Sequence, residues 1–338
     1  MIGNWLRRNR PRPHAVPNAP RVASSENAPN AQQMLRRLEW TVIRRLDGLL
    51  QGDVRTLMRG SGLDLADLRE YQVHDDVRHI DWNVTARLQQ PHVRVFTEDR
   101  EMAAWFLLDL SASVDFGSGA RRKRQVLAEF VAVLARLLTR HGNRVGALLY
   151  GERVERVIPA RASRAHVLRL LHAIEQRPGR PTPDALATTR LADLLGAAAN
   201  LVHRRSTLFV VSDFISAPGW EKPLARLASH HEVVAVRLLD PLERELPDLG
   251  LLTLRDAETG EQLLVDTHDG AFRQRFARLA AEREDGLRLA LARAGVDALE
   301  LSTDDDLLQA IMRFADLRRQ RTRLAAGGGV PAHLRKGG

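Results

Sequence analysis

The sequence predicts an α/β protein built on a doubly wound, mainly parallel sheet, with an additional amino-terminal region and a carboxy-terminal helical extension. Short, continuously apolar runs, typical of buried parallel strands, alternate with segments of helical periodicity. Two of these runs, 105–108 and 207–211, are followed closely by an aspartate, Asp109 and Asp213. The chain has 338 residues, 44% of them hydrophobic, which is ample for a core of this kind.

Helical periodicity and turn residues place the individual elements. Leu35, Leu38 and Val42 recur at helical spacing, and Ser163 is a typical residue for beginning a helix. Residues 153–158 alternate between apolar and polar as an edge strand does. The expected helices cover about 31–50, 120–141, 163–172, 191–201, a segment after Pro218, 271–294 and a last segment ending near 324. The expected strands are 105–109, 144–150, 153–158, 207–211, 233–239 and 296–301, with a hairpin over 251–266.

Composition divides the chain into five parts. Residues 1–30 are rich in Pro, Asn, Ala and Arg and should form a disordered tail. We expect an amino-terminal region at 31–100, the sheet domain at 101–242 and a hairpin with helices at 243–324. Residues 325–338 form a Gly-rich basic tail that should also be disordered.

The stretch Asp109-Leu-Ser111-Ala-Ser113 follows a predicted strand of bulky apolar residues. In an open α/β sheet, ligands bind just beyond the carboxyl ends of the strands, so these side chains fall where a site is expected. Carboxylate and hydroxyl oxygens are hard ligands that suit Mg²⁺ or a similar cation. The alternative is that the aspartate and the serines cap the next helix.

Two later stretches complete a larger pattern. Thr188 and Thr189 precede a helical pattern, and Asp213 follows a second apolar strand. This order of strand, Asp-x-Ser-x-Ser, Thr before a helix, then strand and Asp resembles the von Willebrand factor A domain and its metal-ion-dependent adhesion site. The resemblance implies one Mg²⁺ or Mn²⁺ ion and the following ligands: Asp109, Ser111, Ser113, Thr189 and Asp213. Thr188 is a rival to Thr189, and the glycine that usually precedes this threonine is absent.

Residues 74–81 form a second group of potential ligands. They include His74, Asp75, Asp76, His79 and Asp81, a set that could hold a metal or act in a hydrolase. The neighbouring arginines offer another interpretation, which we favour: an ionic network with Trp82 as its anchor.

This second stretch also carries a family resemblance. The run Asp75-Asp76-Val77-Arg78-His79-Ile80-Asp81-Trp82, followed by Thr85-Ala86-Arg87 and then by Asp109-x-Ser-x-Ser, is similar to the DUF58 family. The likeness covers residues 62–240, with Val114 where the family usually has Met. It implies a bacterial, chaperone-like protein that works with a MoxR-type AAA+ ATPase in assembling or maturing a protein complex. No catalytic residue is implied.

Composition excludes several classes of protein. The chain has no cysteine, which rules out disulfides and thiolate metal sites. It has no Walker A sequence and no nucleophile elbow, and we expect no enzyme activity. It also lacks a secretory signal and an apolar run long enough to span a membrane, which predicts a cytoplasmic protein.

The charge is strongly basic, at +9. Almost all of it comes from arginines spread among acids, with lysine only at positions 123, 222 and 336. Such a spread is typical of a solvated surface rather than of a nucleic-acid site. The sequence therefore predicts a metal-dependent protein-binding module whose partners are a MoxR-type ATPase and a client offering an acidic side chain. The alternatives are a metal-assisted hydrolase using residues 74–81, or an arginine-driven nucleic-acid binder.

Overall fold

The structure of the chain is a computed structural model. The structure describes residues 31–49, 67–72, 77, 80–95, 103–177, 189–255 and 261–325. The two predicted disordered tails lie outside these residues, except for Ala325 at the end of the last helix.

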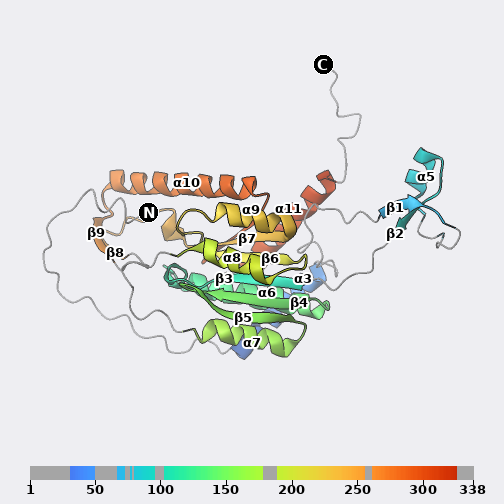
Figure 1. The fold of residues 1–338 in the computed structure, drawn as a ribbon. Helices are drawn as coiled ribbons and strands as arrows, with labels where there is room; N and C mark the ends of the chain where they lie inside the picture. The colour runs from blue at the N-terminus through green and yellow to red at the C-terminus, as the bar shows by residue number, and fades with distance from the viewer. Residues whose placement is uncertain are drawn as a thin grey trace, which may run out of the picture.

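A six-stranded sheet with the order β10-β7-β6-β3-β4-β5 forms the centre of the fold, and the strand labels in Figure 1 follow this order from β7 to β5. All neighbours pair in parallel except β5, which runs antiparallel to β4 and closes one edge. The predicted α/β class and the predicted edge strand are both confirmed. The strands are β3 (Ala103–Asp109), β4 (Arg144–Tyr150), β5 (Val154–Arg161), β6 (Thr207–Ser212), β7 (Glu232–Leu239) and β10 (Asp297–Ser302).

Both faces of this sheet are covered, which is why the central strands are continuously apolar. In β3, Phe106 and Leu108 lie in one core and Leu107 in the other, and all three are fully buried. The first core contains side chains of α6 (Lys123–Arg140), α7 (Arg164–Glu175) and α11 (Leu307–Ala325). The second contains side chains of α8 (Leu191–Leu201), α9 (Glu221–His230) and α10 (Gly270–Arg293).

One close contact between neighbouring strands depends on a glycine. Gly146 in β4 pairs with Trp105 in β3, and a Cβ atom at Gly146 would lie 2.7 Å from the indole ring. The missing side chain therefore lets the Trp105 ring approach the backbone of β4 closely.

The predicted helix 31–50 is interrupted by a wider turn. It consists of α2 (Ala31–Leu38), a π-helical turn η1 (Glu39–Ile43) and α3 (Arg44–Leu49). A π-turn inserts about one extra residue, which shifts the apolar face along the chain. Ile43 is accordingly fully buried, whereas Val42, which the spacing placed on that face, is only partly buried. The segment packs against α6 and α7 and belongs to the first core.

Residues 67–95 contain a small separate sheet. Its strands β1 (Asp67–Glu70) and β2 (His92–Val95) pair antiparallel around α5 (Trp82–Leu88). Asp81 caps α5 by accepting hydrogen bonds from the backbone of Asn83 and Val84. Trp82 is 70% exposed, so the prediction that it anchors this region is wrong: the first residue of α5 projects to solvent. The other acids and histidines of the 74–81 cluster lie outside the described residues.

The carboxy-terminal part of the chain is joined closely to the main sheet. The predicted hairpin is present as β8 (Leu251–Arg255) and β9 (Gln262–Asp266). However, β10 extends the main sheet beside β7, and α11 fills the first core with Ile311 and Phe314. The carboxy-terminal elements therefore complete the sheet as well as extending it.

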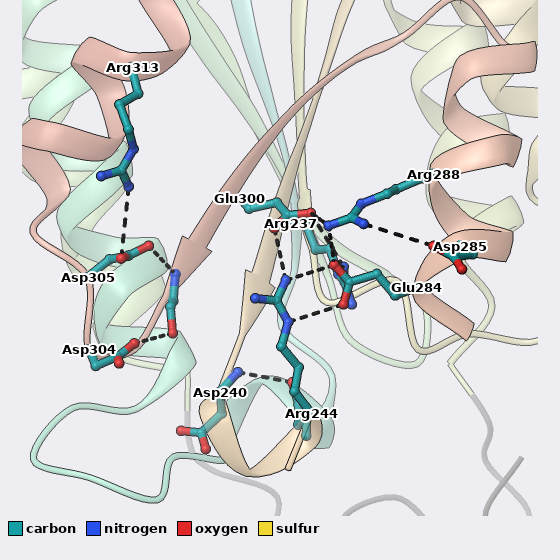
Figure 2. Close-up of polar contacts among 12 residues, drawn as sticks. Arg237, Asp240, Arg244, Glu284, Asp285, Arg288, Glu300, Asp304, Asp305 and Arg313 are labelled. Carbon is teal, nitrogen blue, oxygen red and sulfur yellow. Dashed lines mark hydrogen bonds and ion pairs between the residues drawn. The ribbon is translucent and has the colours of Figure 1, made fainter. Parts of the chain in front are cut away.

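A network of charges fixes α10 to the sheet, as Figure 2 shows. Arg244 donates to both carboxylate oxygens of Glu284 (2.9 and 3.1 Å) and to Glu300 (2.9 Å). Arg237 of β7 and Arg288 of α10 also form ion pairs with the same two glutamates. Burial alone would raise the pKa of Glu284, but Arg237, Arg244 and Arg288 outweigh it and hold that pKa below its ordinary value.

Candidate metal centre

The candidate site lies where the winding of the sheet reverses. From β3 the chain first builds β4 on one side and then returns to build β6 on the other. The carboxyl ends of β3 and β6 therefore flank the switch point, the usual place for a ligand in such a sheet. Asp109 is the last residue of β3, and Asp213 directly follows β6.

Asp109 is fully buried and is held from both strand ends. Its Oδ1 accepts a hydrogen bond from the backbone N–H of Ser111 (3.0 Å), and its Oδ2 accepts one from the hydroxyl of Ser212 (2.6 Å). The same Ser212 hydroxyl accepts from the backbone N–H of Phe214 (2.9 Å). Hydrogen bonds to this carboxylate thus connect the loops that follow β3 and β6.

Ser111 and Ser113 lie together in the loop after β3. Their hydroxyl oxygens are 3.1 Å apart and each residue is only 6% exposed. The short 3₁₀ turn that begins after Ser111 has no side-chain cap, and the next helix, α6, begins after Arg122. The alternative that these serines cap the next helix is therefore wrong, and their hydroxyls face each other instead.

Thr189 is tied to the loop that follows Asp213. Its carbonyl oxygen accepts from the backbone N–H of Ala217 (2.9 Å) and from the hydroxyl of Ser216 (3.0 Å). The Ser216 hydroxyl also accepts from the backbone N–H of Leu191, at the start of α8 (2.9 Å). Thr189 is buried beside the second strand end, whereas the rival Thr188 lies outside the described residues.

Sequence reasoning missed the cation at this site. The ammonium of Lys123, the first residue of α6, lies 2.8 Å from Asp213 Oδ2 and 2.7 Å from Glu243 Oε1. Burial lowers the pKa of Lys123, but the charges of Asp213 and Glu243 outweigh it and leave that pKa above its ordinary value. A signal was available, because Lys123 is one of only three lysines in an arginine-rich chain.

The donor set fits a hard divalent cation. Burial, followed by the charge of Asp213, raises the pKa of Asp109 to about 6. Two buried carboxylates that repel each other form a site where a cation is favourable, and the other predicted ligands are hydroxyl oxygens. Within the described part of the chain, no three His, Cys, Asp or Glu side chains group as a metal site. The candidate therefore depends on its two carboxylates together with Ser111, Ser113 and Thr189.

A third buried aspartate holds the loop that precedes α6. Asp240 follows β7 and accepts hydrogen bonds from the backbone N–H of Ser118 (2.9 Å), its hydroxyl (2.6 Å), and the hydroxyl of Thr303 (2.8 Å). Burial alone would raise the pKa of Asp240, but these bonds, with one from the Leu242 backbone, hold it below its ordinary value. An apolar strand followed by an aspartate was visible here in the sequence too, and was overlooked.

The fold and this site together define an α/β protein with a buried oxygen-rich centre at its switch point. A family profile described as "Protein of unknown function DUF58" matches residues 67–286. The chain therefore belongs to the DUF58 family, as its motifs predicted. The profile reaches further towards the carboxyl end than the 62–240 resemblance and includes most of α10.

Curated relatives come from mycobacteria. "Uncharacterized protein Rv1480" of Mycobacterium tuberculosis and "Uncharacterized protein Mb1516" of Mycobacterium bovis are each 39% identical over 292 residues, covering 86% of this chain and 91% of theirs. "Uncharacterized protein MAV169" of Mycobacterium avium is 35% identical over 163 residues, covering 48% of this chain and 94% of its own.

Solved structures with a similar arrangement include two domains at low identity. The conserved hypothetical protein BatB from Bacteroides thetaiotaomicron is 12% identical with a TM-score of 0.42, covering 65% of this chain and 99% of its own. The SpRpn10 VWA domain is 15% identical with a TM-score of 0.37, covering 63% and 95%. Among the described helices, none combines the length and the apolar character needed to cross a membrane.

Proposed function

We propose that this protein is a protein-binding module whose contact with its partner is made through a Mg²⁺ or Mn²⁺ ion at the β3–β6 switch point. The observation that carries the proposal is the buried pair of carboxylates, Asp109 and Asp213, each at the end of a central strand. A bound divalent ion would supply a positive charge able to accept a carboxylate from the partner as a further ligand.

The residues of this chain support capture better than catalysis. Ser111, Ser113 and Thr189 are neutral donors, and both oxygens of Asp109 already accept hydrogen bonds that fix its orientation. Asp213 is likewise held, with Oδ1 accepting from the Ile215 backbone and Oδ2 from Lys123. A rigid, pre-oriented set of ligands suits recognition of one acidic side chain.

The proposed partner comes from the resemblance drawn in the sequence analysis. We propose a MoxR-type AAA+ ATPase and a client protein that offers an aspartate or glutamate, with the pair acting in assembly or maturation of a complex. The hydrolase alternative is less well supported, because one of its proposed residues, Asp81, has a structural role as the cap of α5.

The test is co-purification of the full-length protein with the cognate ATPase or client, in Mg²⁺ and after chelation. Wild type should retain its partner only with the ion, whereas Asp109→Ala and Ser113→Ala should lose it while remaining folded by circular dichroism. Asp304→Ala is the matched control, because Asp304 is an exposed acid on the turn before α11. It should bind as wild type does.

Two results would contradict the proposal. Partner binding that persists in a folded Asp109→Ala variant would show that the ion is not the contact. Tight Zn²⁺ binding that survives the same substitution would show that the protein's metal site lies elsewhere.

A further inference from the structure

Lys123 is an unusual residue to find at the start of a helix. The amino-terminal end of a helix carries partial positive charge, so a cation there is unfavourable by the helix dipole alone. The side chain is nevertheless fully buried, and its ammonium also lies 5.9 Å from the centre of the Phe116 ring. Buried ammonium groups are strongly unfavourable unless paired, so the two carboxylates determine this position.

The two candidate carboxylate ligands differ in their counter-charge. Asp213 has the Lys123 ammonium at 2.8 Å. The described groups that hydrogen-bond Asp109 are neutral: the backbone and side chain of Ser111 and the hydroxyl of Ser212. The charge of Asp213 is therefore balanced by a cation of the same chain, whereas the charge of Asp109 is not.

Glu243 gives Lys123 a second partner whose position is fixed independently. Its Oε1 lies 2.7 Å from the ammonium, and its Oε2 accepts from the backbone N–H of Asp240 at the end of β7 (3.1 Å). Lys123 can therefore remain paired with Glu243 if Asp213 binds another cation. A buried charge is never left unpaired in that exchange.

We propose that Lys123 is a tethered cation that competes with the divalent ion for Asp213 and so keeps the affinity of the site for free ions low. This inference rests on the proposed function and adds its regulation. Two cations near one carboxylate repel each other, and Lys123 is attached to the chain, so it is present at any concentration of free ion. A partner carboxylate supplies extra negative charge and shifts the balance towards the divalent ion.

The substitution Lys123→Met tests this competition, because it keeps an unbranched side chain only one atom shorter and removes its charge. Calorimetric titration of the full-length protein with MgCl₂, and separately with MnCl₂, should give an affinity at least about tenfold higher than in wild type. Its melting temperature should fall without divalent ions and be restored by Mg²⁺. Lys222→Met is the matched control, since Lys222 is an exposed lysine on α9, and its affinity should equal that of wild type.

Each outcome decides the matter. If a folded Lys123→Met variant binds Mg²⁺ no more tightly than wild type, while wild-type binding is lost in Asp109→Ala, the competition is disproved and the metal site stands. If neither protein binds Mg²⁺ or Mn²⁺, the metal site itself is disproved, and the competition with it. If Lys123→Met does not fold without divalent ions, its folded fraction is measured as Mg²⁺ is added. Recovery of the folded state on addition of Mg²⁺ supports the proposal, and a variant that stays unfolded overturns it.

Discussion

Asp109 illustrates how far a single residue could be predicted and where prediction ended. Its place at the end of an apolar strand was enough to locate it at a ligand-binding edge, and the same pattern located Asp213. Lys123 could not be located in this way, because it lies 90 positions from Asp213 and its helix gives no local reason for a buried cation. Strand-end patterns identify positions, whereas pairing between distant elements depends on the packed fold.

Substitution of Asp109 should change how stability depends on pH. Its folded pKa of about 6 lies above its ordinary value of 3.8, so between these values the folded state binds more protons than the unfolded state. Without divalent ions, this residue therefore lowers stability as pH rises from about 4 to about 6, and its effect is constant above that. Asp109→Asn lacks this penalty, so its stability relative to wild type should rise by on the order of 2 kcal/mol between pH 4.5 and pH 7.5.

The measurement is urea unfolding of both proteins with a chelator at pH 4.5 and pH 7.5. The stability of the variant relative to wild type should be smaller at the lower pH, where the wild-type carboxyl is largely protonated in the folded state. A difference between the two proteins that does not change with pH would contradict the assigned shift.

At the scale of elements, periodicity predicted the helices and strands of the main sheet and of the carboxy-terminal part, but not β1, α5 and β2, and not how the elements are joined. The π-turn at Glu39–Ile43 moved the buried face from Val42 to Ile43, and no periodic pattern anticipates an inserted residue. The strand near 296–301 was predicted, yet its place beside β7 was not, since sheet order depends on contacts distant in sequence. The helix α10 was predicted from an Arg, Ala and Leu pattern that hid its buried charge, Glu284.

The attachment of α10 should depend on Glu284. This carboxylate has an 11% exposed side chain and accepts from Arg244 and Arg288, while Arg237 lies 3.4 Å away. Glu284→Gln leaves Arg237 with less counter-charge inside the protein and should lower the free energy of unfolding by about 1–3 kcal/mol. Glu282→Gln is the control on the same helix. Glu282 is 65% exposed and lies 4.0 Å from Arg278, so its loss should change stability by less than about 0.5 kcal/mol.

Urea unfolding at neutral pH compares the two variants with wild type. Equal stability of Glu284→Gln and Glu282→Gln would mean that α10 is held by its apolar contacts alone, among them the buried Leu291.

For the whole molecule, not all of the basic residues lie on the surface, as the sequence had indicated that they would. The arginines were expected on a solvated surface, but Arg237 and Arg318 are buried. Arg318 pairs with Glu232 and Asp297, which joins α11 to the edge of the sheet at β7 and β10. Some arginines therefore act as internal links between the carboxy-terminal elements and the sheet, a role that composition cannot distinguish from solvation.

This distribution of charge leads to a prediction about nucleic acid. A net charge of +9 should still attract duplex DNA at low salt through phosphate contacts that do not depend on sequence. Because part of the positive charge is neutralised internally and no nucleic-acid motif is present, affinity should be weak and should fall at least about tenfold between roughly 50 and 200 mM salt. Fluorescence anisotropy with two duplexes of unrelated sequence measures both properties, and the two should bind equally at every salt concentration. A complex that prefers one duplex and persists at about 150 mM salt would identify the protein as a specific DNA binder and would displace the protein-binding role proposed for it.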